Sequence, residues 1–398
     1  MPIYLGSHKL GDICKGSGSI ARGYYGSVLV YEKPQPQPGP NTVRFKFSDP
    51  DYNPNNDTWP WRTGATWTRN MSYVNENVWD YHRAFSGEYR DWELEFNTNG
   101  ASFPNAPFQD YEHNKVTVLG FNPGYTMSPD FSTMGTAFTG SMSGMFDNNT
   151  ALVGVENFML GETYNASMLF AYCTNLEYVH FRKYNRSSIC ESMLDAFNDC
   201  RNLVEIRNLD VSKVQDLHRL FGECFNLANL VDCNMSLENA TNIVAMYGNC
   251  ESLTQFPSNI DCTNLTSLAS VFGGCAQMVT PPTFTNTEGI TSISRLFDNC
   301  YNLESIPVFY TANVEDFDYA FAACRSIRNI PALSTGKAKT VNSMFNQCVN
   351  VETGTLGMYN QLSTQATPPT NYYSCFRDCG SNTVTGAAEL AQIPAAWK

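Results

Sequence analysis

Apolar residues recur with a fixed period of about 25 residues over the second half of the chain. In the unit around Cys300, the aromatic residue Phe297 stands three positions before the cysteine, and Leu303 stands three positions after it. One earlier unit has Asn149 at the cysteine position. The unit recurs roughly ten times, and the cysteines that mark it are Cys173, Cys200, Cys224, Cys250, Cys275, Cys300, Cys324, Cys348 and Cys379.

Each unit is predicted to form one coil of a solenoid. A short helical or 3₁₀ piece, as in residues 217–221, would lead to the cysteine, and a strand, as in residues 303–308, would follow it. A single coil cannot bury its own apolar side chains, so the coils stack and their aromatic and cysteine columns fill a continuous interior. A period of about 20–29 residues with leucine, and cysteine or asparagine at one position, is typical of leucine-rich repeats. The predicted fold class is therefore α/β, a leucine-rich-repeat solenoid of about ten coils preceded by small β-rich domains.

The stacking also predicts the state of the cysteines. Equivalent cysteines on adjacent coils would have parallel Cβ bonds and lie about 4.8 Å apart, whereas a disulfide needs Cβ atoms that converge to about 3.8 Å. The column is therefore expected to consist of reduced, buried thiols. Cys375 and Cys379 are close enough in sequence to suggest a metal site, but no matching Cys or His pair accompanies them. We expect no metal and no cofactor.

The first 33 residues carry a different period, of ten residues. Short strands joined by glycine turns at this spacing predict a small β-meander. The alternating prolines of residues 34–40 then predict an extended linker and a domain boundary. The pairs that mark the period are Gly6 and Ser7, Gly16 and Ser17, and Gly26 and Ser27.

Residues 41–139 are predicted to form a β-rich domain, because apolar and polar residues alternate at 43–47, 92–96 and 116–120. Five of the six tryptophans of the chain fall in this domain. They would either stack on sugar rings or fill the core of the domain. The domain is also expected to cover the apolar end of the first coil. The solenoid would then span residues 140–382, and residues 383–398 would form a C-terminal cap or tail.

Composition and charge exclude several classes of function. The net charge of −13 argues against non-specific binding of nucleic acid, which needs clustered Lys and Arg. No apolar run is long enough to insert into a membrane, and the N-terminus lacks the basic start and apolar core of a secretory signal. The five histidines are dispersed, and neither a G-x-S-x-G elbow nor a phosphate-binding glycine loop is present. We therefore predict that the protein is not an enzyme.

The pattern [Met/Leu]-Phe-x-x-Cys-x-x-Leu-x-x-Ile-Pro, legible from Leu296 to Pro307, resembles the BspA-type leucine-rich repeats of bacterial surface proteins and their phage-encoded relatives. The resemblance covers about residues 140–382 and implies surface recognition rather than chemistry. The N-terminal Gly-Ser phrase resembles N-terminal elements of tailed-phage virion proteins. That second resemblance implies a module that attaches a fibre or adhesin to the particle; the alternative is a plain hairpin packed on the next domain.

Strand geometry selects a candidate binding face. In Leu-x-x-Ile-x-Ile units the first, fourth and sixth positions point inward, so the third and fifth face the exposed strand surface. These residues differ in type along the repeats, as expected of a surface for a specific partner, although an ordinary solvated face would look the same. The candidate binding residues are Tyr178, His180, Glu205, Arg207, Asn229, Gln255, Ser305 and Asn329, and the candidate anchoring residues are Gly6, Ser7, Gly16, Ser17, Gly26 and Ser27.

These observations lead to a functional hypothesis, a phage virion structural protein that displays its repeats as a head or tail fibre or adhesin. It would be assembled in the host cytoplasm and would occur as an oligomer. Its expected partners are other virion proteins, bound through the N-terminal module, and a host cell-surface protein or glycan. The alternative is a BspA-like adhesin on a bacterial cell surface, and a third hypothesis, which we favour less, is an enzyme that acts on glycans.

Overall fold

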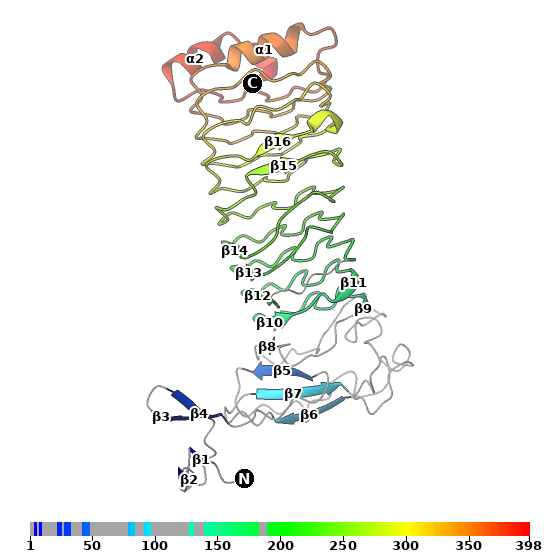
Figure 1. Cartoon of the computed structure of the whole chain (residues 1–398). Helices are drawn as coiled ribbons and strands as arrows, with labels where there is room; N and C mark the ends of the chain where they lie inside the picture. Colours follow the sequence, from blue (N-terminus) through cyan, green and yellow to red (C-terminus); the bar gives the residue numbers. More distant parts are fainter. Residues whose placement is uncertain are drawn as a thin grey trace. The chain divides into compact units, whose positions relative to one another are not determined.

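The protein is described here by a computed structural model (Figure 1). It describes residues 139–150, 152–182 and 189–398 and, before them, the backbone of eight strands. The chain divides into two compact units, Met1–Gly39 and Pro40–Lys398. The eight strands are β1 (Tyr4–Leu5), β2 (His8–Lys9), β3 (Arg22–Tyr25), β4 (Val28–Glu32), β5 (Thr42–Phe47), β6 (Trp79–Arg83), β7 (Asp91–Phe96) and β8 (Met127–Asp130).

The first unit contains two hairpins. Strand β1 pairs antiparallel with β2, and β3 pairs antiparallel with β4, in two separate two-stranded sheets. The six predicted anchoring residues stand outside the described strands, so the predicted meander and its anchoring role stay predictions.

The second unit contains the repeats, which stack as coils one above the next (Figure 1). Its further strands are β9 (Thr139–Ser141), β10 (Gly154–Phe158), β11 (Glu162–Asn165), β12 (Tyr178–Phe181), β13 (Glu205–Arg207), β14 (Asn229–Val231), β15 (Asn259–Asp261) and β16 (Thr283–Thr285). The helices are the 3₁₀ turn η4 (Thr287–Gly289), the α-helices α1 (Thr355–Thr364) and α2 (Val384–Ala391), and the 3₁₀ turn η5 (Ala395–Trp397).

One sheet joins the repeats to the strands that precede them. Its strand order is β14-β13-β12-β10-β8-β5-β7-β6. The strands from β14 to β8 are parallel, and β8, β5, β7 and β6 pair antiparallel. Strands β5 and β7 lie where alternation predicted them, whereas the predicted strand at 116–120 is outside the described residues. Because β8 pairs with β10, the sheet continues past the first repeat, and the predicted boundary at residue 139 stays a prediction.

The aromatic column lies inside the stack, as its period predicts. Ten rings follow one another, and the centroids of consecutive rings are 5.0–6.1 Å apart. Every ring is buried, and several pairs are nearly parallel, such as Tyr247 and Phe272 with an interplanar angle of 5°. At the C-terminal end Trp397 stacks on Tyr372 at 4.3 Å and lies 6.3 Å from Phe376, the last ring. This indole covers the end of the aromatic column.

The cysteine column is also internal. The thirteen cysteines within the described residues are free thiols, as predicted from the coil spacing. Each thiol from Cys173 to Cys348 in the column donates a hydrogen bond to the main-chain oxygen of the aromatic residue one coil earlier; Cys224 Sγ, for example, lies 3.1 Å from the Phe197 oxygen. The thiols therefore fill the interior and also link adjacent coils.

The helical piece predicted at residues 217–221 is wrong, because the structure has a run of turns there. Arg219 and Glu223 adopt positive φ angles of 48° and 60°, which a right-handed helix does not allow. The N–H groups alternate in direction: Leu220 and Gly222 donate within the turn, whereas Arg219 and Glu223 donate to the next coil. A helix would direct all of its N–H groups along its own axis. The turns instead use half of them to bind the neighbouring coil.

A column of polar residues starts these turns. In most coils the side-chain oxygen of the residue in this column accepts a hydrogen bond from the N–H group two residues later, as in an Asx or Ser/Thr turn. The same residues form one-residue parallel bridges from coil to coil. Seven residues with both contacts are Asn165, Ser192, Asp216, Asn242, Ser267, Ser292 and Asp316.

The strand predicted at residues 303–308 is also wrong, because no regular strand is present in that segment. Pro307 has no N–H group to donate to a ladder, and Pro257, Pro282 and Pro331 stand at the corresponding place in other coils. Among the described repeats, a regular strand follows the cysteine position in six coils, at β10 and β12–β16, and not in all of the roughly ten predicted. The parallel run of β8, β10, β12, β13 and β14 ends where the first of these prolines, Pro257, enters the next coil.

Candidate recognition face

The candidate face is the outer surface of the parallel strands β10, β12, β13 and β14. Tyr178 on β12 pairs in register with Glu205 on β13, which pairs with Asn229 on β14. His180 on β12 likewise pairs with Arg207 on β13. The structure thus places five of the predicted binding residues on three adjacent strands.

Alternation explains why these side chains face outward. Leu176, Val179 and Phe181 are buried, and Tyr178 and His180 between them are half-buried on the other side of the sheet. This is the inward pattern expected of the first, fourth and sixth positions. The geometry of the face was therefore predictable, and the binding role of its residues stays a prediction.

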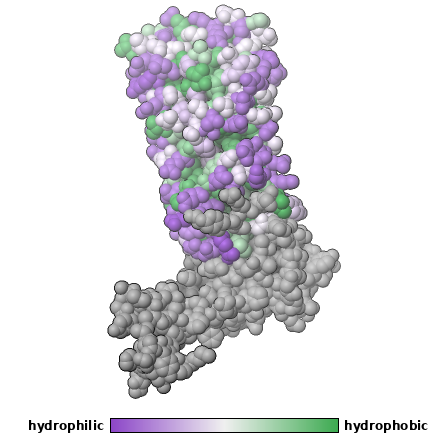
Figure 2. All heavy atoms as spheres, in the orientation of Figure 1, coloured by the Kyte–Doolittle hydropathy of each residue, from purple (hydrophilic) through white to green (hydrophobic). Residues whose placement is uncertain are grey.

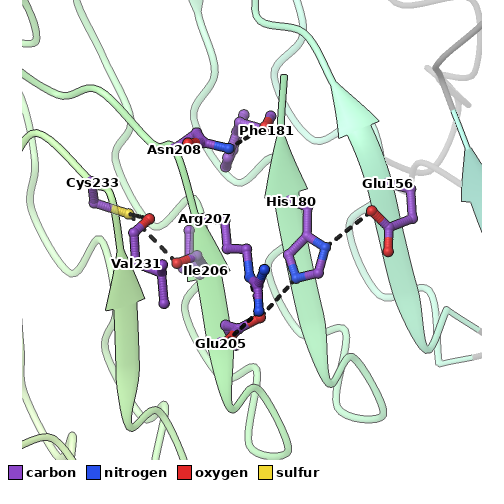
Figure 3. A network of polar contacts seen from close by, with 9 residues as sticks. All are labelled: Glu156, His180, Phe181, Glu205, Ile206, Arg207, Asn208, Val231 and Cys233. Carbon is purple, nitrogen blue, oxygen red and sulfur yellow. Dashed lines mark hydrogen bonds and ion pairs between the residues drawn. The ribbon is translucent and has the colours of Figure 1, made fainter. Parts of the chain in front are cut away.

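His180 lies at the centre of a polar network on this face (Figure 3). Its Nδ1 atom is 3.0 Å from Glu156 Oε2, and its Nε2 atom is 2.9 Å from Glu205 Oε1. Glu205 also accepts two hydrogen bonds from Arg207, at 2.6 Å from Nε and 3.1 Å from Nη2. The four side chains form a continuous chain of polar contacts from β10 through β12 to β13.

The network holds Glu205 and Arg207 in their charged forms. Hydrogen bonds from Arg207 are the main reason that the pKa of Glu205 is lowered, and His180 contributes to a smaller extent. The pKa of Arg207 is raised mainly by its hydrogen bonds with Glu205, with smaller contributions from the charges of Glu156 and Asp232. Both side chains are therefore ionised across the neutral pH range.

Tyr178 is positioned by the residue across the strand pair. It lies opposite Gly154 of β10, and a Cβ atom on Gly154 would collide with the Tyr178 ring. The ring therefore packs over the glycine backbone, and its centroid is 4.9 Å from that of His180. Aromatic cover of a strand glycine fixes the side chain in one place.

The remaining three candidates lie outside this array. Gln255, Ser305 and Asn329 are exposed, but none belongs to a named strand. Asn329 forms a bridge with Thr353, whose hydroxyl donates to the Asn329 side-chain oxygen at 2.6 Å. The proline-containing coils separate these residues from the paired strands, so the structure does not extend the ordered face to them.

Sequence reasoning missed Glu156, which is the fourth member of the network. It stands seven residues after Asn149, just as His180 stands seven after Cys173 and Arg207 seven after Cys200. The coil with Asn149 in place of cysteine therefore carried the signal. Applying the same spacing to that coil would have found Glu156.

The outer surface of the solenoid shows hydrophilic and hydrophobic side chains interspersed on the face seen in Figure 2. In the part of the chain that the structure describes, no group of three or more His, Cys, Asp or Glu side chains is placed to hold a metal ion. No helix among those residues has the length and apolar character needed to span a bilayer. The tryptophans at positions 59, 61 and 67, expected either to stack on sugar rings or to fill a core, lie outside the described residues.

Two solved structures are similar to the chain, each at 14% identity and over 61% of its length. One is a leucine-rich repeat protein from Bacteroides ovatus ATCC 8483, matched over 69% of its length with a TM-score of 0.29. The other is a leucine rich cell surface protein from Faecalibacterium prausnitzii A2-165, matched over 94% of its length with a TM-score of 0.22.

No curated protein matches the chain. A family model described as "Mycoplasma protein of unknown function, DUF285" matches residues 140–264 and 266–380, which together make up more than half of the sequence. The match covers the stacked coils and the whole of the β10–β14 face. The chain, a leucine-rich-repeat solenoid, thus belongs to the family DUF285.

Proposed function

We propose that the protein is a surface-recognition protein of the BspA-like kind, which acts at a bacterial cell surface and binds a protein or glycan. The observation that carries the proposal is the ordered polar face of β10–β14, where Tyr178, His180, Glu205, Arg207 and Asn229 lie on adjacent paired strands. The resemblance of the repeats to BspA-type sequences supports the same function.

The face has the physical properties of a binding surface. Tyr and Arg side chains contribute most to many protein interfaces, and Tyr178 and Arg207 are both present here. Arg207 has a side-chain exposure of 48% and is already held by Glu205, so little side-chain entropy would be lost when a partner binds. We propose recognition without catalysis for this face.

A binding experiment with matched variants tests the proposal. The face variant carries Tyr178→Ala, Arg207→Ala and Asn229→Ala, and the control carries Tyr301→Ala, Arg325→Ala and Asn302→Ala. The control residues are of the same types and are exposed, with Arg325 4.8 Å above the ring of Tyr301 in the turns. Binding is measured on a glycan array and on immobilised cell-surface proteins.

We expect the face variant to lose at least tenfold in affinity, as substitution of aromatic and Arg contacts commonly does. The control variant should bind as the unmodified protein does. The face variant should melt lower than the control, because Tyr178 is half-buried and packs over Gly154, so binding is compared at a temperature at which both variants are folded. Equal binding by the two variants would show that the β10–β14 face is not the recognition surface.

A virion function is the second candidate, and one observation favours it. Residues Met1–Gly39 form a compact unit of their own, as an attachment module would. The comparisons give this function no support, so it rests on the Gly-Ser resemblance. Its test is incorporation into phage particles by the full chain and by a chain that begins at Pro40. Absence of the full chain from particles would exclude the virion function.

A further inference from the structure

Both ring nitrogens of His180 face carboxylate oxygens. Nδ1 is 3.0 Å from Glu156 on β10, and Nε2 is 2.9 Å from Glu205 on β13. An ionised carboxylate only accepts hydrogen bonds, so each ring nitrogen must carry a proton for both contacts to be favourable. The observed geometry therefore fits the imidazolium form, which donates from both nitrogens.

The neutral ring cannot keep both contacts. It has one N–H donor and one nitrogen lone pair, and a lone pair that faces a carboxylate oxygen is repelled. One of the two carboxylates must then move away. Exchange between the two imidazole forms is general histidine chemistry at ordinary biological pH.

The surroundings decide which carboxylate leaves. Glu205 is also held by two hydrogen bonds from Arg207 and has a side-chain exposure of 22%. Glu156 has a side-chain exposure of 39%, and among the described residues its carboxylate has a hydrogen-bond contact with His180 alone. Loss of the proton should therefore release Glu156 into solvent and leave Glu205 on Nε2.

The remaining groups near His180 do not replace this contact. Tyr178 packs beside the ring on the same strand, and Arg182 follows two residues later along the chain. Arg207 is bound to Glu205 on the far side. The main chain of Glu156 pairs with Asp130 on β8, which holds its backbone in place while its side chain can turn outward.

We propose that His180 is a proton-controlled clasp on the recognition face: its imidazolium form ties β10 to β13 through Glu156 and Glu205, and its neutral form releases Glu156. Loss of the proton lowers the net charge of the face by one unit, and release frees the Glu156 carboxylate for a new contact. Partner binding by the face therefore depends on pH, a consequence that rests on the proposed function. The clasp itself does not depend on it.

The test compares melting temperatures of the full-length protein and three variants at about pH 5.5 and about pH 8, on either side of histidine titration. His180→Gln removes the clasp. Glu156→Gln replaces the carboxylate by an amide, which can either donate or accept and so suits both ring forms. His218→Gln is the control, since His218 is the other histidine whose side chain the structure describes, it is half-buried, and its side chain makes no hydrogen bond to another described residue.

We expect the unmodified protein and His218→Gln to lose the same number of degrees between the two pH values. In His180→Gln and in Glu156→Gln the decrease in melting temperature should be smaller by about 2 °C or more, because the stabilising ion pair that they remove is present only at the lower pH. In ¹⁵N spectra of the imidazole ring at the lower pH, His180 should show two protonated nitrogens. Unchanged pH dependence in both His180→Gln and Glu156→Gln, or a singly protonated ring there, would overturn the clasp.

The outcome separates the clasp from the proposed function. A clasp seen in melting and spectra, together with no partner binding at either pH, would contradict the proposed function alone. Partner binding that the Tyr178, Arg207 and Asn229 variant abolishes, without any His180-dependent change in melting, would contradict the clasp alone.

Discussion

At the scale of single residues, the repeat cysteines combine two roles. Cys224 is buried in the column, and burial raises the pKa of its thiol, mainly by desolvation. The thiol therefore stays neutral and packs as a small apolar side chain. Its thiol also donates to the Phe197 oxygen, which already accepts the N–H group of Cys200 at 3.2 Å. A carbonyl oxygen has two lone pairs, and both are used here. The sequence predicted the burial, whereas the hydrogen bond depends on the coil-to-coil register.

Tyr247 is the one member of the ring column with a hydroxyl group, and that group is buried without a hydrogen-bond partner. Its pKa is raised because burial disfavours the phenolate. A buried hydroxyl that makes no hydrogen bond costs about 1–3 kcal/mol. We therefore expect Tyr247→Phe to raise the free energy of unfolding by about 1–2 kcal/mol, measured by denaturant titration.

The matched control is Phe272→Tyr, which adds a hydroxyl to the next ring, 5.7 Å away. It should destabilise the protein by a similar amount, since Phe272 is fully buried. A loss of stability in Tyr247→Phe would instead mean that an ordered water or a shifted main-chain group satisfies the Tyr247 hydroxyl.

At the scale of elements, the period of the sequence predicted the stack but not the local structure between its fixed points. The spacing of Phe297, Cys300 and Leu303 identifies the inward positions without reference to backbone angles. It does not distinguish a helical piece from successive turns, because both place an apolar residue inward every three or four residues. The positive φ angles at Arg219 and Glu223 occur at residues that carry no glycine signal. The turns were therefore hidden from the sequence.

The candidate site was predictable to a similar degree. Strand alternation placed Tyr178, His180, Glu205, Arg207 and Asn229 on the outer face, and the prolines that exclude Ser305 from a strand were visible in the sequence. The ion pairs between these side chains were not predictable. They depend on which strands are neighbours and on side-chain rotamers.

Asp316 shows what the polar turn column contributes to an element. One of its oxygens accepts the Asp318 N–H at 3.0 Å, and the other accepts the Ser292 hydroxyl at 3.1 Å. Loss of a side chain that caps the backbone in this way commonly costs about 0.5–2 kcal/mol. We expect Asp316→Ala to lower the free energy of unfolding by about 1–2 kcal/mol and Asp316→Asn to retain most of it, because the amide oxygen still accepts.

The neighbouring residue supplies the control for that measurement. Glu315 forms a 2.7 Å ion pair with Lys339, whose side chain is 70% exposed. Such exposed pairs contribute about 0–1 kcal/mol, so Glu315→Ala should change the denaturation midpoint little. A larger loss in Glu315→Ala than in Asp316→Ala would show that coil-to-coil ion pairs, rather than turn caps, hold this edge of the stack.

At the scale of the whole molecule, the solenoid has no single centre, because each coil packs mainly on its two neighbours. Stability then depends on covering the ends of the column. Trp397 covers the C-terminal end, and the sheet continues from β10 into β8 and β5 at the other end. The unit Met1–Gly39 is compact by itself.

A chain that begins at Pro40 should therefore fold and melt within about 1 °C of the full chain, because Pro40–Lys398 is a compact unit by itself. The control is a chain that ends at residue 382, which removes Trp397 and exposes the ring of Phe376. Calorimetry should show a lower melting temperature for the control. A melting temperature lowered equally in both truncated chains would mean that residues 1–39 are part of the solenoid's folding unit.

The buried thiols set an alkaline limit to the stability of the molecule. Burial raises the pKa of Cys190 and Cys233 to about 11 and that of Cys262 and Cys379 to about 12, and it raises the pKa of the other repeat cysteines as well. In the unfolded chain the thiols ionise near the ordinary value of about 8.5. Below that pH they are neutral in both states, and their contribution to stability is complete. Above that pH only the unfolded chain loses protons, so each buried thiol favours unfolding by about 1.4 kcal/mol per pH unit until the pH reaches the pKa of that thiol in the folded protein.

We expect the thiols to leave the denaturation midpoint unchanged up to about pH 8.5 and to make it fall steeply above about pH 9. Replacing Cys190, Cys233 and Cys262 by Ala should make the fall shallower, and thiolate absorbance should appear together with unfolding. Thiolates that form near pH 9 while the protein remains folded would show that the cysteine column is open to solvent.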